Sequence, residues 1–84
     1  MEGIITEEKI AFGKFISAKR KENGLTQAEL AQRLYVTESA VSKWERGISY
    51  PDITLVTAIC SALEISEHKL IMASDDIHQR QVEL

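Results

Sequence analysis

Four polar residues share one side of a short helical segment in the middle of the chain. With Val41 set at 0° and successive residues about 100° apart, Ser39, Ser42, Lys43 and Arg46 fall between roughly 100° and 200°. The two small serines would let a helix backbone come close to the base edges of a nucleic acid, while the lysine and arginine supply reach and positive charge. Plain solvent exposure is the alternative explanation for such a face.

The elements that carry this face form a pair. Thr37 is a good N-cap for the helix, and Gly47 with the apolar residue after it is typical of a helix stop. The preceding helix, at about 26–34, begins with a capping box made by Thr26 and Glu29. Two short helices joined by a tight turn are the layout of a helix-turn-helix, whose second helix enters the major groove of DNA.

The remaining segments also have helical periodicity, so we expect an all-α bundle of five helices. The first helix is predicted over 6–23, the fourth follows Pro51 with Asp52 as its cap, and the fifth starts at Ser66. The residues predicted to face the core from these three helices are Phe12, Ile16, Ile53, Val56, Ile59, Cys60, Leu63, Leu70 and Ile71.

Two opposite charges lean toward the interior. Arg20 continues the stripe of Phe12 and Ile16 along the first helix, and Glu45 lies on the inner side of the third. This pattern predicts a structural ion pair between the two helices. Trp44 also falls on the inner side, which favours core packing over base stacking.

The overall charge hides a split along the chain. The 84 residues carry 13 acids and 10 Lys and Arg, a net charge of −3. Residues 9–46 hold eight bases and four acids, whereas residues 47–84 hold two bases and six acids. The basic middle segment fits a polyanionic partner.

Several classes of protein are excluded by what the sequence lacks. One Cys permits no internal disulfide, and the longest uncharged run, 11 residues over 53–63, is too short for a membrane helix. We therefore expect a cytoplasmic protein without membrane contact. No glycine-rich phosphate loop or hydrolase motif is present, so we expect neither an enzyme nor a cofactor. His68 and His78 lack the neighbours that a metal site needs.

Two longer motifs resemble the Cro/C1-type helix-turn-helix of the XRE family. Residues 24–31 read GLTQAELA and residues 36–47 read VTESAVSKWERG. They are similar to the start of that family's motif and to its recognition helix with its stop. Pro51 and the Ala62-Leu63 pair near Ser66 also fall where the family places them, so the resemblance covers about residues 12–71.

The resemblance implies a lambda-repressor-like bundle that binds a double-stranded DNA operator, usually as a homodimer. By position it implies that Gln27 touches a phosphate and braces the recognition helix. It implies that Ser42 and Arg46 lie near the DNA backbone. The residues that it places nearest the base edges are Thr37, Glu38, Ser39 and Lys43.

Two positions depart from the family pattern, which usually has Gly where this chain has Tyr35 and Glu64. A left-handed conformation at Tyr35 would cost about 1 kcal/mol or more, so we expect the turn to differ locally.

The expected function is transcription regulation through sequence-specific DNA binding, as a repressor. The domain is assigned to 12–71, with the helix-turn-helix at about 27–46. An N-terminal lead (1–11) precedes it, and a C-terminal tail or linker to a longer protein (72–84) follows. Two alternatives stay open: a protein-interaction module and an antitoxin-like member of the same family. The fifth helix and residues 74–84 are the expected dimer surface.

Overall fold

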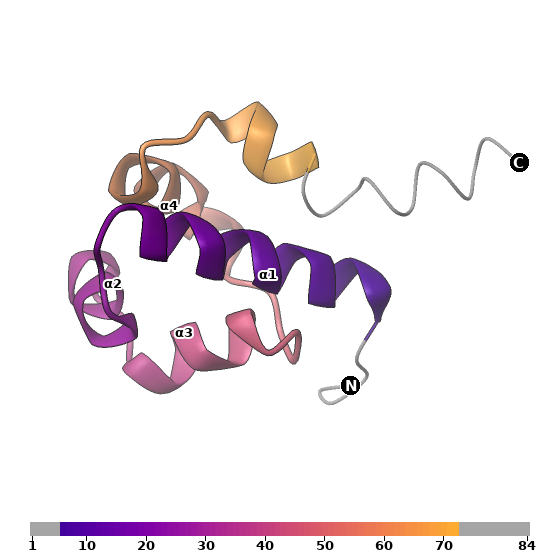
Figure 1. Cartoon of the computed structure of the whole chain (residues 1–84), viewed down its shortest axis with the longest axis horizontal. Coiled ribbons are helices and arrows are strands. Elements are labelled where there is room, and N and C mark those ends of the chain that lie inside the picture. Colours follow the sequence, from indigo (N-terminus) through magenta and orange to yellow (C-terminus); the bar gives the residue numbers. More distant parts are fainter. Residues whose placement is uncertain (1–5, 73–84) are drawn as a thin grey trace, which may run out of the picture.

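The computed structural model describes residues 6–72, and every regular element among those residues is a helix. The order is α1 (Glu7–Glu22), α2 (Gln27–Leu34), α3 (Glu38–Glu45), the short 3₁₀ helix η1 (Ile53–Leu55) and α4 (Val56–Leu63), followed by a fifth helix over 67–72. In Figure 1, α1 runs across the middle of the molecule, with α3 below it and the fifth helix above it. The five helices confirm the predicted all-α bundle with a central helix-turn-helix.

Side-chain caps explain where the helices begin. Thr6, Thr26, Thr37 and Ser66 each accept a hydrogen bond from the backbone N–H three positions later, at 3.0–3.2 Å. Glu29 completes the predicted capping box, because its Oε1 accepts from the backbone N–H of Thr26 at 2.8 Å. These caps satisfy N–H groups that have no partner inside the helix.

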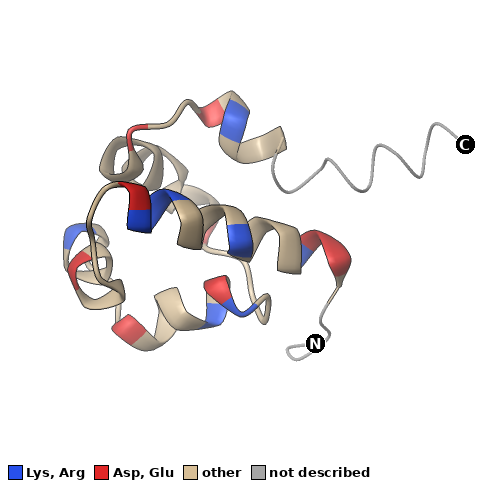
Figure 2. Ribbon diagram, viewed as in Figure 1, with Lys and Arg blue, Asp and Glu red and all other residues tan. Residues whose placement is uncertain are grey.

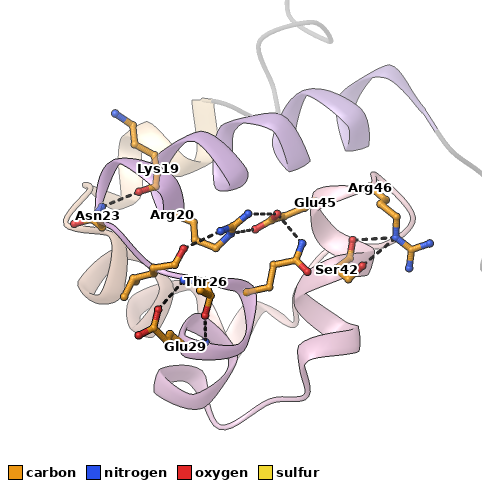
Figure 3. Close-up of polar contacts among 10 residues, drawn as sticks. Lys19, Arg20, Asn23, Thr26, Glu29, Ser42, Glu45 and Arg46 are labelled. Carbon is orange, nitrogen blue, oxygen red and sulfur yellow. Dashed lines mark hydrogen bonds and ion pairs between the residues drawn. The ribbon is translucent and has the colours of Figure 1, made fainter.

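All five helices contribute to one apolar core, and Trp44 and Cys60 belong to it as predicted. The buried residues are Phe12, Ile16, Leu25, Leu30, Ala31, Leu34, Val41, Trp44, Ile59, Cys60, Leu63 and Leu70. Asn23 ties the end of α1 to the end of α4, because its Nδ2 donates to the carbonyls of Lys19 at 2.8 Å and Leu63 at 3.0 Å (Figure 3 shows the bond to Lys19).

Two predicted core positions are wrong. Ile53 is 82% exposed, because Asp52 caps the η1 turn and α4 begins only at Val56, so Ile53 is out of register with the inner stripe of α4. Ile71 is 52% exposed, whereas its neighbour Leu70 is 3% exposed. Adjacent residues on a helix point about 100° apart, and in this short helix Leu70 takes the inward position.

Four helices end in the same way, with one left-handed residue followed by an apolar residue. The left-handed residues are Gly24, Tyr35, Gly47 and Glu64, with φ of 70°, 58°, 77° and 56°. In each case the next N–H donates to the carbonyl five positions earlier, at 2.9–3.1 Å. This is the Schellman ending, which satisfies the last carbonyls of a helix.

The expected local difference in the turn at Tyr35 is therefore absent. Tyr35 takes the left-handed conformation itself, at φ 58° and ψ 40°, and the N–H of Val36 still reaches the carbonyl of Ala31 at 3.0 Å. The hydrogen bonds of the ending keep the turn in shape, and the side chain, 95% exposed, meets nothing that would push it elsewhere. The cost is steric strain at a non-glycine residue.

We predict that Tyr35→Gly and Glu64→Gly each raise the free energy of unfolding by about 1 kcal/mol. Glycine removes left-handed strain of about 1–2 kcal/mol, and its greater freedom in the unfolded chain cancels part of the gain. Urea unfolding at constant m-value measures the difference. Gly24→Ala is the matched control, since a Cβ there meets no atom within 4 Å and isolates the cost of a positive φ. A neutral result for both glycine variants alongside a destabilised control would contradict the prediction.

Candidate nucleic-acid interface

The inner side of α3 fixes this helix against α1. Val41 is fully buried and Trp44 is 4% exposed. At Gly13 the two backbones touch, because a Cβ there would lie 2.6 Å from the carbonyl oxygen of Glu45 and closer still to that of Trp44. Hydrophobic periodicity does not identify this role of Gly13. The available signal was a glycine inside an amphipathic helix, which is unfavourable by about 1 kcal/mol relative to Ala and so points to a close approach.

The outer side of α3 carries the predicted base contacts. Glu38, Ser39 and Lys43 are exposed. Thr37 is exposed as well, although helical angles counted from Val41 at about 100° per residue would turn it inward. The reason is that Thr37 is the N-cap, with an extended backbone at φ −83° and ψ 155°, and helical angles do not apply there. All four side chains are thus accessible on α3 and its cap.

Two of the predicted phosphate contacts are bonded to each other. Arg46 Nε lies 3.1 Å from Ser42 Oγ and 3.3 Å from the carbonyl oxygen of Ser42. The guanidinium therefore lies along the last turn of α3, and in Figure 3 its two terminal nitrogens point away from the helix. This arrangement holds a positive charge at the edge of the exposed face.

Gln27, the third predicted phosphate contact, belongs to a hydrogen-bond network with Arg20 and Glu45, and Figure 3 shows how the latter two side chains meet. Glu45 Oε1 accepts from Gln27 Nε2 at 2.9 Å and from a terminal nitrogen of Arg20 at 3.0 Å. Glu45 Oε2 accepts from Arg20 Nε at 2.7 Å, so the ion pair is bidentate. The other terminal nitrogen of Arg20 donates to the carbonyl of Leu25 at 2.8 Å. One partly buried cluster thus joins α1, the turn after it, α2 and α3.

The electrostatics of this cluster keep both charges in place. The side chains of Arg20 and Glu45 are only 11% and 6% exposed. Burial raises the pKa of Glu45, but hydrogen bonds from Arg20 and Gln27 and the charge of Arg20 outweigh it and leave the pKa below its ordinary value. The hydrogen bond to Glu45 raises the pKa of Arg20. The pair is therefore ionised near neutral pH. Figure 2 marks basic residues in blue along α1 and at the end of α3.

An apolar pocket lies apart from the polar face of α3, between α1, η1 and the fifth helix. Its volume is about 290 Å³, and it is lined by Phe12, Tyr50, Pro51, Ile53, Val56, Leu70 and Ile71. The ring of Tyr50 meets that of Phe12 edge to face, with centroids 5.2 Å apart. The exposed side chains of Ile53 and Ile71 extend this apolar surface.

No three His, Cys, Asp or Glu side chains within residues 6–72 come together as a metal site would require, and His78 lies outside that range. Each helix in the same range is too short or too polar to cross a lipid bilayer.

Two capped short helices, a tight turn and an exposed polar face braced from behind by α1 define a helix-turn-helix domain. The family comparison agrees, since the helix-turn-helix profile matches residues 16–70. The chain belongs to the Cro/C1-type helix-turn-helix family, which is a DNA-binding fold of transcription regulators and not an enzyme family.

Named relatives and solved structures show the same likeness. The HTH-type transcriptional activator BcrR of Enterococcus faecalis is 31% identical over 72 residues, which cover 86% of this chain and 35% of BcrR. The HTH-type transcriptional regulator SinR of Bacillus licheniformis is 32% identical over 65 residues, or 76% of this chain and 59% of SinR. The P22 c2 repressor, solved in complex with a synthetic operator, superposes with a TM-score of 0.67 at 34% identity, covering 70% of this chain and 89% of that one. The chain thus spans about a third of BcrR and three-fifths of SinR.

Proposed function

We propose that this chain binds double-stranded DNA in a sequence-specific manner and regulates transcription. The observation that carries the proposal is the exposed polar face of α3, which is held on α1 by buried side chains and a backbone contact. An α-helix with small outer residues fits the major groove, which is about 12 Å wide. The family and the operator complex of the P22 c2 repressor support the same function.

The residues of the face divide into two roles. We assign base contacts to Thr37, Glu38, Ser39 and Lys43. Lys43 is long enough to reach guanine O6 and N7, and Glu38 can accept from cytosine N4. We assign phosphate contacts to Gln27, Ser42 and Arg46. Gln27 is the first residue of α2, where backbone N–H groups and the helix dipole favour an anion.

Selection of bound duplexes from a random library is the direct test of DNA binding. We expect enrichment of one motif and a retarded species in a gel shift at low salt. A protein-interaction module of the same fold would retain no duplex at any salt concentration. An antitoxin would enrich a motif and also bind a toxin partner, so this alternative concerns an additional partner.

We predict that variants of the face separate into two kinds. Lys43→Ala should weaken binding by about 1–3 kcal/mol and relax the preference at one base position, whereas Gln27→Ala should weaken all sequences alike. Arg46→Ala should lower the salt slope by about one unit. Affinities for single-base operator variants at two salt concentrations measure these effects. If Lys43→Ala lowers every affinity equally and base preference survives, Lys43 contacts only the backbone.

We further propose that the chain binds as a homodimer, with two recognition helices about 34 Å apart, one turn of the duplex. One short helix reads too few base pairs to select a site in a genome. The apolar surface around Tyr50, Ile53 and Ile71 supports a dimer contact on the fifth helix. Residues 74–84, the other part of the expected surface, lie outside the described range. Sedimentation on the selected duplex should give two chains per site, and a 1:1 complex would contradict this proposal.

We propose that the chain represses transcription and acts in the cytoplasm. Residues 12–71 form the proposed binding domain, and residues 72–84 are its tail or a linker. The c2 protein is named a repressor and BcrR an activator. A reporter placed behind the selected operator decides between them: expression should fall when the chain is produced, and a rise would identify an activator.

A further inference from the structure

The side-chain amide of Gln27 can face its surroundings in two ways, with its N–H₂ end or its carbonyl end. A carboxylate can only accept hydrogen bonds. Because Gln27 Nε2 lies 2.9 Å from Glu45 Oε1, the N–H₂ end faces α3. This bond uses one of the two Nε2 hydrogens and leaves the second.

Glu45 itself is held in place. The bidentate contacts from Arg20, at 2.7 and 3.0 Å, fix its carboxylate, and the bond from Arg20 to the carbonyl of Leu25 fixes the guanidinium. Leu25 lies two residues before Gln27 in the sequence. The hydrogen bonds and this short stretch of backbone therefore form a closed ring. Neither charged side chain is more than 11% exposed, and neither can swing toward DNA while the fold is intact.

We propose that Glu45 is a positioning residue for DNA binding: it orients the amide of Gln27 so that the second Nε2 hydrogen is presented to a phosphate oxygen, with Arg20 holding Glu45 in turn. The inference rests on the proposed DNA binding. It assigns the buried pair a role in binding that is separate from its contribution to stability. A side chain oriented before binding loses less rotamer freedom when it meets its phosphate.

The decisive variant separates orientation from stability. Arg20→Met combined with Glu45→Leu replaces the buried pair by apolar side chains, a change that is often neutral or stabilising. Gln27 then has no acceptor on α3. Lys19→Ala is the control on α1, because it removes contacts with Glu22 and the Phe15 ring and none with the cluster around Glu45. Arg20→Leu combined with Glu45→Leu is a second apolar variant, which likewise removes both charges and leaves Gln27 without a side-chain acceptor at position 45.

The experiment replaces single phosphates of the selected duplex by neutral methylphosphonates and measures affinity for each. For the wild type we expect one position at which the replacement weakens binding about tenfold, and Gln27→Ala should lose this sensitivity. The double variant, folded by circular dichroism, should lose it as well, and so should the second apolar variant. Both should keep the sensitivity at the phosphate that Arg46→Ala identifies, and Lys19→Ala should behave as the wild type.

The experiment distinguishes failure of the proposed DNA binding from failure of the positioning role. If the wild type binds no duplex, the proposed function fails. If the wild type and Gln27→Ala differ as expected but the double variant keeps the tenfold sensitivity, Gln27 finds its phosphate unaided and the positioning role is overturned. If Arg20→Met with Glu45→Leu does not fold, Arg20→Leu with Glu45→Leu decides by the same criterion.

Discussion

Gly13→Ala should destabilise the domain by about 3 kcal/mol. The added methyl group would meet the backbone carbonyls of Trp44 and Glu45, which cannot rotate away as a side-chain end could. Either α3 moves off α1 or the clash remains, and overpacking of this kind costs about 1–3 kcal/mol, occasionally more. Helix propensity alone predicts the opposite sign, a gain of about 1 kcal/mol.

The experiment therefore asks whether Gly13→Ala lowers or raises the free energy of unfolding. Ala18 is exposed on α1. Ala18→Gly therefore measures the difference in helix propensity between Ala and Gly in the same helix, without a clash. Urea unfolding of the two variants should show a loss for both. A stabilised Gly13→Ala, mirroring the loss in Ala18→Gly, would mean that the backbones of α1 and α3 separate at little cost.

Arg20→Ala and Glu45→Ala should each lower the free energy of unfolding by about 3–5 kcal/mol, because each strands a buried charge. A domain whose total stability is about 5–15 kcal/mol could unfold as a result. The double alanine variant should lose less than the sum of the two, since it strands neither charge. A loss below about half a kcal/mol in each single variant would mean that the pair behaves as a solvated one.

The pH dependence of stability offers an independent check on the pair. The folded pKa of Glu45 lies below its ordinary value of 4.5, so its contribution is fully present above that value and is lost as the pH falls through the folded pKa. Hydrogen bonds from Thr26 and Thr54 lower the pKa of Glu29 and Asp52, so these groups add to acid lability. Urea unfolding of the wild type and Glu45→Gln from pH 7 down to pH 3 isolates the Glu45 part. The stability difference between the two should shrink on acidification.

Local signals predicted much of the fold. Thr26 with Glu29, Thr37, and the glycines at 24 and 47 set helix starts and stops through hydrogen bonds to nearby backbone, so their effect is visible in the sequence. The errors arise where neighbours in space decide. Ile53 follows a cap that starts a 3₁₀ turn, and nothing within that segment shows that α4 begins three residues later.

The candidate site also contains some contacts that local sequence patterns predict and others that depend on neighbours in space. Helical angles placed Arg20 and Glu45 on facing sides, and their side chains do meet. The bond from Gln27 to Glu45 joins residues 18 positions apart, and no periodicity within one helix contains it. Gly13 shows the same limit, because its role depends on a crossing between α1 and α3 that only the folded chain defines.

The two-sided character of α3 has a consequence for how such a domain changes over time. The residues that hold the helix, Val41, Trp44 and Glu45, are distinct from the exposed ones at 38, 39 and 43. Mutations at the exposed positions can therefore accumulate without threatening the fold, and, under the proposed base contacts, each combination would give a new operator preference on an unchanged scaffold. After gene duplication, a few codon changes at these exposed positions would be enough for one copy to bind a different operator. Regulatory circuits could then diverge through surface substitutions alone.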